Sequence, residues 1–216
     1  MQWKWKIQLD SKVCEYIVGE NQHKHYSFLI ETVGNQHIRF YVERNARLVV
    51  EVLIASDANI HIECILRGAG ADAQITGAYI LDASDDIKIT SMQHHLVPHT
   101  QSSLTMKGLL RDKSHAQYHG MVRIEKEAQG SCASQENKNI LLSDKARAVS
   151  VPSLEVLAHD VRCSHGSAVG RFDQQQLFYA ASRGIDEKSA QRLLSTAFVA
   201  DLFADEVLKN KVIELL

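Results

Sequence analysis

A cysteine and a histidine lie two residues apart in Cys163-Ser164-His165, within the stretch DVRCSHGSAVG that begins at Asp160. If this stretch is a strand, both side chains leave the same face, because successive side chains of a strand alternate. A thiolate and an imidazole are suitable ligands for iron, zinc or copper, but two ligands make only half of a tetrahedral site. The pair is therefore either half of a metal site completed from elsewhere, or a buried thiol beside a hydrogen-bonded histidine.

The eleven histidines also form close groups elsewhere. These groups are His23 and His25; His94, His95 and His99; and His115 and His119. Separately, HIEC at 61–64 holds His61, Glu63 and Cys64. Alternation along a strand sends His94 and His95 to opposite faces, whereas His115 and His119 share a face. Within HIEC, alternation places Cys64 on the face opposite His61 and Glu63. Structural roles are favoured for the groups at 94–99 and 115–119, and HIEC is a weak cluster. A histidine-rich metal-binding protein stays an alternative.

Signatures of common enzymes and scaffolds are missing from the chain. The four cysteines are scattered and form no CxxC pair, so neither a zinc ribbon nor a disulfide framework is indicated. GxSxG, the P-loop, HExxH and GxGxxG do not occur. No pair of carboxylates is singled out as an acid and a base. We expect no catalyst, with a β-solenoid carbohydrate-active enzyme as the alternative.

Short β-rich segments recur along the middle of the chain, and they begin at residues 47, 59, 72, 86, 102, 115, 131, 148 and 161. Many of them alternate apolar with polar or small residues, which is typical of half-buried strands. Even spacing fits a sandwich, a barrel or a solenoid. The absence of Asn-Gly and Asp-Gly hairpin dipeptides favours the solenoid, although a sandwich stays open.

The two ends of the chain have different patterns. The first 45 residues also look β-rich, from WKWKIQL to HIRFYVER. After residue 172, Asp173 can cap a helix and Gly184 can close it, and a second helical pattern runs from Asp186 to the end. We expect a β-helix core over 1–171 and a helical segment over 172–216.

Charge and hydropathy exclude several classes of protein. The 24 basic and 26 acidic side chains give a formal net charge of -2, so no basic field attracts nucleic acid. No window approaches the roughly 18 apolar residues of a membrane span. The first residues lack the apolar region of a secretory signal. We therefore expect a cytoplasmic protein that binds neither nucleic acid nor membranes.

Residues from about 94 to 200 closely resemble the SufB/SufD family of iron–sulfur cluster assembly proteins, specifically its SufD branch. The most specific stretches are P-x-L-E-V at 152–156, CSHG at 163–166 and LFYAASRGI at 177–185. The resemblance implies a mainly β fold: a right-handed parallel β-helix followed by a C-terminal helical segment. It also implies a scaffold that works with a SufB-like chain and a SufC-like ATPase. Typical SufD proteins begin with a long helical region, whereas this chain begins almost directly with strands.

The resemblance also implies roles for individual residues. SufB-like chains carry a functional cysteine where this chain has Ala146, and SufD-like chains carry CSHG, whose histidine is implicated at the SufB–SufD interface. His165, with Cys163 beside it, would then provide metal ligands at that interface. The helical segment would bind the ATPase through Leu177, Phe178, Tyr179, Arg183 and Gly184. The alternative is that these helices cap the open end of the solenoid.

The resemblance bears on cofactors and assembly as well. No cofactor is expected to stay tightly bound to the isolated chain, and iron or an iron–sulfur cluster would be held transiently at the hetero-interface. Without its partners the chain should form a homodimer, because exposed sheet edges favour symmetric pairing.

Overall fold

The structure is a computed structural model that describes residues 4–5 and 13–216. The strand predicted over WKWKIQL therefore lies mostly outside the described residues. The described strands are β1 (Lys4–Trp5), β2 (Val13–Val18), β3 (His23–Ile30), β4 (Gly34–Val42), β5 (Arg47–Ile54), β6 (Ala58–Leu66), β7 (Asp72–Leu81), β8 (Asp86–His95), β9 (Gln101–Leu110), β10 (His115–Ile124), β11 (Ser131–Leu141), β12 (Arg147–Val156) and β13 (Val161–Gly170). Each of the nine strands predicted from residue 47 onward begins within one residue of its expected start.

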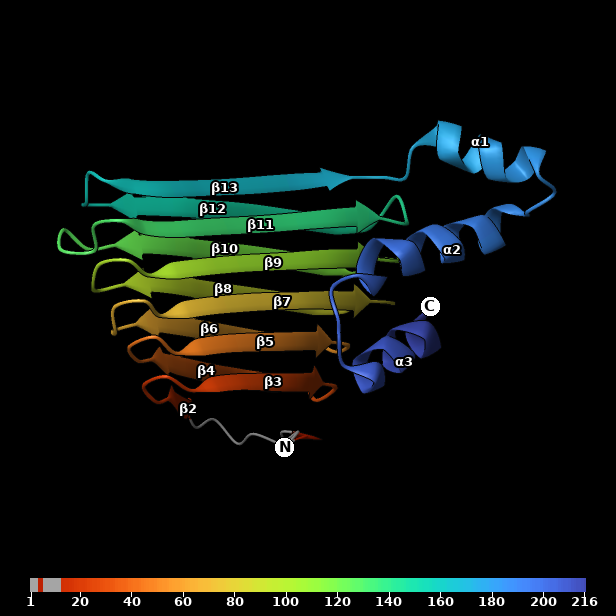
Figure 1. Cartoon of the computed structure of the whole chain (residues 1–216). Coiled ribbons are helices and arrows are strands. Elements are labelled where there is room, and N and C mark those ends of the chain that lie inside the picture. The colour runs from red at the N-terminus through yellow and green to blue at the C-terminus, as the bar shows by residue number, and fades with distance from the viewer. Residues whose placement is uncertain (1–3, 6–12) are drawn as a thin grey trace.

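The strands form two sheets, one of odd-numbered and one of even-numbered strands, which we call the odd sheet and the even sheet. The chain passes from one sheet to the other, so the coils stack as layers (Figure 1). The described strand pairs are all parallel, which excludes an antiparallel sandwich. The fold is the predicted parallel β-solenoid.

The interior of the solenoid changes character along its axis. In the first coils it is aromatic and apolar, with Tyr16 and Phe40 stacked at a ring-centroid distance of 5.3 Å. In the later coils polar side chains are buried, and they include Gln93, Gln135 and Asn137. Most buried polar groups in proteins are hydrogen-bonded, and Asn137 Nδ2 here donates to Tyr79 Oη at 3.1 Å. The later coils therefore carry a polar network where the first coils carry a simple apolar core.

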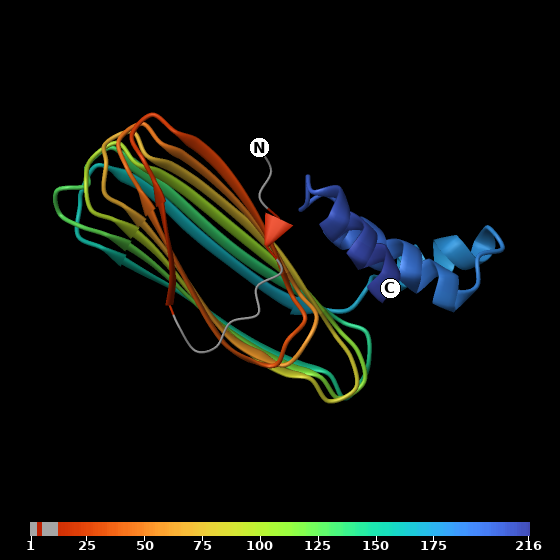
Figure 2. The ribbon, with the colours of Figure 1, turned by 90° about the horizontal axis from the view of Figure 1, so that it is seen from below.

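The helices α1 (Gln174–Ser182), α2 (Glu187–Ala200) and α3 (Glu206–Leu215) follow the last strand. They lie together on one side of the solenoid (Figures 1 and 2), and the loop between α2 and α3 rests on the outer face of the odd sheet. There Lys107 Nζ donates to the carbonyl of Phe198 at 2.7 Å, and Thr76 Oγ1 donates to that of Leu202 at 2.9 Å. Strands from several coils thus hold the helical segment in place. The division into domains at residue 171 stays a prediction.

The helix boundaries confirm one part of the sequence prediction and correct another. Asp173 and Asp186 accept hydrogen bonds from the first turns of α1 and α2, and Gly184 has a φ of +80° in the closing turn of α1. One helix from Asp186 to the end was predicted, and this is wrong. The second helix stops at Ala200, and Asp205 then caps α3 by accepting from the next turn. Side-chain capping of this kind stabilises a new helix start despite continuous apolar spacing.

Candidate functional site

The last coil leaves one end of the solenoid open. Strand β12 ends the even sheet and β13 ends the odd sheet, and neither has a further strand at its outer edge within the described residues (Figure 1). We call the inward-facing side chains of these two strands the open end. Unpaired strand edges carry free N–H and C=O groups, so they favour pairing with another chain.

The open end exposes apolar side chains that a further coil would bury. Leu154 and Val156 are 37% and 38% exposed, although they stand in register with Val122 and Ile124, which are fully buried one coil below. Val169, on β13, is 45% exposed. A row of inward apolar residues without a covering layer is typical of a protein–protein contact surface.

Cys163 and His165 lie at this open end. They pair in register with Ala133 and Gln135, both buried in the coil below, so both side chains are on the inward face of β13. Cys163 packs against the last apolar cluster, and burial raises the pKa of its thiol. His165 is exposed. The predicted common face is confirmed, and the structure adds that this face is the inward one.

Beneath His165, the polar interior reaches the open end. Neither polar atom of the Gln135 amide has a hydrogen-bond partner among the described residues, although both are buried. Gly120 makes room for this amide, since a Cβ at that position would lie 2.1 Å from Gln135 Nε2. Ala146 is fully buried just before β12. The thiol and imidazole of the open end therefore border a polar, incompletely satisfied interior.

The described residues provide no complete metal site at the open end. Cys163 and His165 belong to no group of three or more ligand side chains in residues 4–5 and 13–216. Their metal role stays a prediction. A site there would need ligands from another chain, as half of a tetrahedral sphere does.

The side chains predicted to bind a partner lie mainly on the surface of α1, which buries none of its residues. Phe178 and Tyr179 are 77% and 61% exposed, and the Arg183 guanidinium lies 5.2 Å from the centre of the Tyr179 ring. The capping alternative is wrong for Phe178, because its side chain remains exposed and the helices lie beside the solenoid (Figure 2). Exposed aromatic side chains next to an arginine are common in interfaces.

Within the described residues, neither the histidines at 94–99 nor those at 115–119 belong to a group of three or more ligand side chains. His94 points outward and pairs with Glu125 at 2.8 Å, whereas His95 is fully buried and hydrogen-bonds two hydroxyls inside the solenoid. Burial, with a contribution from the charge of His94, lowers the pKa of His95 to about 4. His115 pairs with Asp86 at 3.1 Å. These contacts agree with structural roles.

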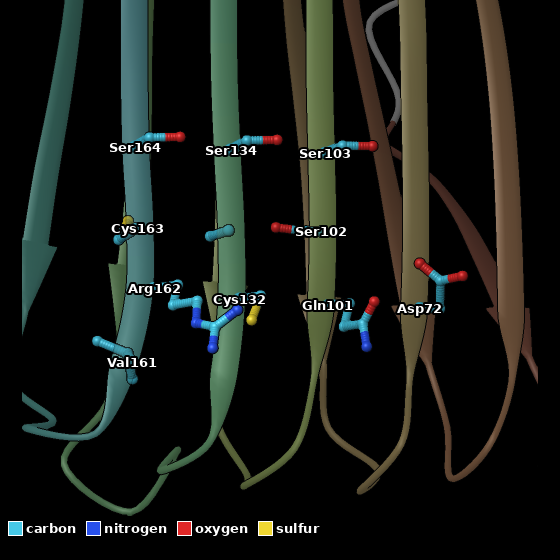
Figure 3. Close-up of a pocket in the computed structure, with 11 residues that line it drawn as sticks. Asp72, Gln101, Ser102, Ser103, Cys132, Ser134, Val161, Arg162, Cys163 and Ser164 are labelled. Atoms are coloured by element: carbon cyan, nitrogen blue, oxygen red, sulfur yellow. The ribbon is translucent and has the colours of Figure 1, made fainter.

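A hollow of about 600 Å³ lies on the outer face of the odd sheet near β13 (Figure 3). Ser103, Ser134 and Ser164 lie side by side across it, on three adjacent strands. Asp72 is the only carboxylate in its lining. Glycoside hydrolysis uses two carboxylates about 5–10 Å apart, so this hollow does not support the carbohydrate-enzyme alternative.

Sequence reasoning missed one cluster, which joins His37 to His61 and Glu63 on the outer face of the even sheet. HIEC was expected to be a weak cluster because alternation separates Cys64 from His61 and Glu63, whereas the third ligand side chain lies on another strand. The signal was present as a spacing: His37 precedes His61 by one coil of the solenoid, and the two are register partners.

Comparison with known proteins agrees with this architecture. Residues 5–198 match the family model described as SUF system FeS cluster assembly, SufBD core domain. The chain is 28% identical over 230 aligned positions to the iron–sulfur cluster assembly protein SufD of Escherichia coli, covering 94% of this chain and 54% of that one. It is 37% identical over 145 positions to an iron–sulfur cluster assembly SufBD family protein of Mycobacterium bovis, covering 63% and 36%. Protein ABCI7, chloroplastic, of Arabidopsis thaliana is 28% identical, with 88% and 42% covered.

The chain spans about half the length, or less, of these curated relatives. Within the described residues, none of the helices has the length and apolar content that a membrane crossing needs. The family model covers most of the sequence, including the solenoid and the CSHG segment. The chain therefore belongs to the SufBD core family of the SUF system, and it is SufD-like.

Proposed function

We propose that this chain is a scaffold component for iron–sulfur cluster assembly and not a catalyst by itself. The observation that carries the proposal is the open end, where Cys163 and His165 lie among uncovered apolar side chains. A related solenoid stacked there would extend both sheets and bury Leu154, Val156 and Val169. Relatives of this chain are named as iron–sulfur cluster assembly proteins, which supports a cluster or its iron as the cargo.

In this proposal the partner at the open end is a SufB-like chain, which provides the ligands that Cys163 and His165 lack. Iron or a nascent cluster is then held transiently at the interface, because each chain alone has an incomplete ligand set. A SufC-like ATPase binds the exposed surface of α1, with Phe178, Tyr179 and Arg183 as contacts. Without partners, two copies pair through their open ends. We place the complex in the cytoplasm.

The experiment combines the purified chain with candidate SufB-like and SufC-like chains, and light scattering gives the mass of the complex. Leu154→Glu places a charge at the open end and should weaken pairing by roughly 100-fold, since an unpaired buried charge costs about 3 kcal/mol or more. Val151→Glu is the matched control, because Val151 is 43% exposed on the outer face of the same strand. Equal pairing by both variants would contradict the proposed interface.

A second comparison tests the ligand role. His165→Ala should leave the mass of the complex unchanged and abolish cluster formation, followed by visible absorbance after anaerobic addition of iron and sulfide. His23→Ala changes an exposed histidine at the far end of the odd sheet and serves as the control. Full cluster formation by His165→Ala would rule out the half-site.

A further inference from the structure

The outer face of the even sheet brings together two imidazoles and one carboxylate. His37 lies on β4, and His61 and Glu63 lie on the neighbouring strand β6. His37 and His61 are register partners whose ring centroids are 4.4 Å apart, with the rings perpendicular. Because Glu63 is two residues after His61, its side chain is on the same face. Parallel pairing of two coils thus assembles three ligand-type side chains at one point.

The spacing of the ligand atoms suits a small metal ion. His61 Nε2 is 2.8 Å from Glu63 Oε1, and His37 Nε2 is 3.4 Å from Glu63 Oε2. One ligand atom from each residue lies within 4.8 Å of the other two. Bonds of about 2.0 Å in a tetrahedral sphere set ligand atoms roughly 3.3 Å apart. Small side-chain rotations would bring the three ligand atoms to this separation.

Hydrogen bonds hold the Glu63 carboxylate in place beside the two imidazoles. Arg39 donates a hydrogen bond to the Glu63 carboxylate, and His61 Nε2 lies 2.8 Å from Glu63 Oε1. Arg39 binds Glu63 and also Glu15, at 2.8 Å. The carboxylates of Glu63 and Glu15 thus lie on either side of one guanidinium, and Lys88 lines the adjoining hollow. An arginine that fixes a carboxylate also orients it for a metal, as outer-shell partners commonly do.

His37 Nε2 is buried and makes no hydrogen bond of good geometry within the described residues. Its one contact with a charged group is the Glu63 carboxylate, at 3.4 Å, which is longer than a normal hydrogen bond. A hollow of about 280 Å³, lined in part by His37, His61 and Thr90, adjoins the cluster. It gives an ion access and leaves room for water as a further ligand.

We propose that His37, His61 and Glu63 bind one divalent transition-metal ion. Two imidazoles and one carboxylate favour Zn²⁺, Co²⁺, Ni²⁺ or Fe²⁺ over Mg²⁺ and Ca²⁺, which prefer oxygen ligands alone. The site lies on the even sheet near the N-terminal coils, whereas Cys163 and His165 lie on the last strand of the odd sheet. It is therefore a second site, independent of the open end.

Zinc titration by calorimetry of the chelator-treated chain tests the proposal. The parent protein carries Cys163→Ala and His165→Ala, so that the open end cannot contribute. We expect one equivalent of Zn²⁺, with binding weakened roughly tenfold or more in His37→Ala and in Glu63→Gln, since each change removes a ligand. His115→Ala is the matched control, because His115 is also a part-exposed histidine on the outer face of the even sheet, paired with Asp86.

Cobalt gives an independent reading. Co²⁺ should produce visible absorption bands in the parent and in His115→Ala, and these bands should be lost in the two ligand variants. Circular dichroism without metal checks folding, and Glu63→Gln preserves side-chain volume if His37→Ala does not fold. The proposal is overturned if no stoichiometric binding occurs, if the ligand variants bind as the parent does, or if His115→Ala weakens binding equally.

Discussion

Glu51 anchors the helical segment to the solenoid, and its replacement by glutamine should release that segment. The side chain is 3% exposed on the outer face of β5. Its two oxygens accept from the backbone N–H groups of Ala204 at 2.7 Å and Asp205 at 3.0 Å, where α3 begins. The carboxylate thus joins residues more than 150 positions apart in the sequence.

The expected loss follows from these two hydrogen bonds. A hydrogen bond to a charged group contributes about 1.5–3 kcal/mol. Glutamine keeps one acceptor oxygen but turns an NH₂ group toward the second backbone donor, which is then buried without a partner. We expect Glu51→Gln to lower the free energy that holds the α2–α3 loop on the sheet by about 2–3 kcal/mol.

Hydrogen exchange resolved by residue measures this loss. Amides of residues 202–209 should exchange roughly 30-fold faster or more in Glu51→Gln, since about 1.4 kcal/mol corresponds to a factor of ten. Glu43→Gln is the control, because Glu43 forms a surface pair with Arg67 and such pairs contribute little. The reasoning is refuted if exchange over 202–209 is unchanged, or if it accelerates equally in the core strands.

Two further predictions concern pH and backbone conformation. The unfolded chain binds a proton at His95 near pH 6.5, whereas the buried side chain has a pKa of about 4. The contribution of His95 to the free energy of unfolding should therefore be constant above about pH 6.5 and fall as the pH drops toward 4, by at most about 3 kcal/mol. The free energy of unfolding of His95→Gln, measured with urea, should depend less on pH over this range. Gly184→Ala should destabilise the end of α1 by about 1 kcal/mol, because φ is +80° there. Gly170→Ala, whose Cβ also meets no atom within 4 Å, should be neutral; equal hydrogen exchange of α1 in both variants would contradict this.

The fold was largely predictable from the sequence because strand alternation and turn residues are local properties. The predicted starts at residues 59, 102 and 148 differ by one position from β6, β9 and β12. The caps at Asp173 and Asp186 were predictable for the same reason, since a capping side chain binds its own first turn. The cap at Asp205 is equally local and was missed, because the apolar spacing continues through it. What could not be predicted is that Glu51, from a distant strand, holds this break on the sheet.

The candidate sites, like the fold, depend partly on local sequence and partly on tertiary structure. The sequence by itself determined that Cys163 and His165 share a face, because that depends only on their being two residues apart in a strand. Tertiary structure decided that this face is the inward one, at the end where stacking stops and the column above Val122 and Ile124 is uncovered. It also decided that His37 meets His61, since contact between coils depends on the register and length of each turn. Alternation is a property of neighbouring residues, whereas burial and ligand geometry depend on which coil lies above and below.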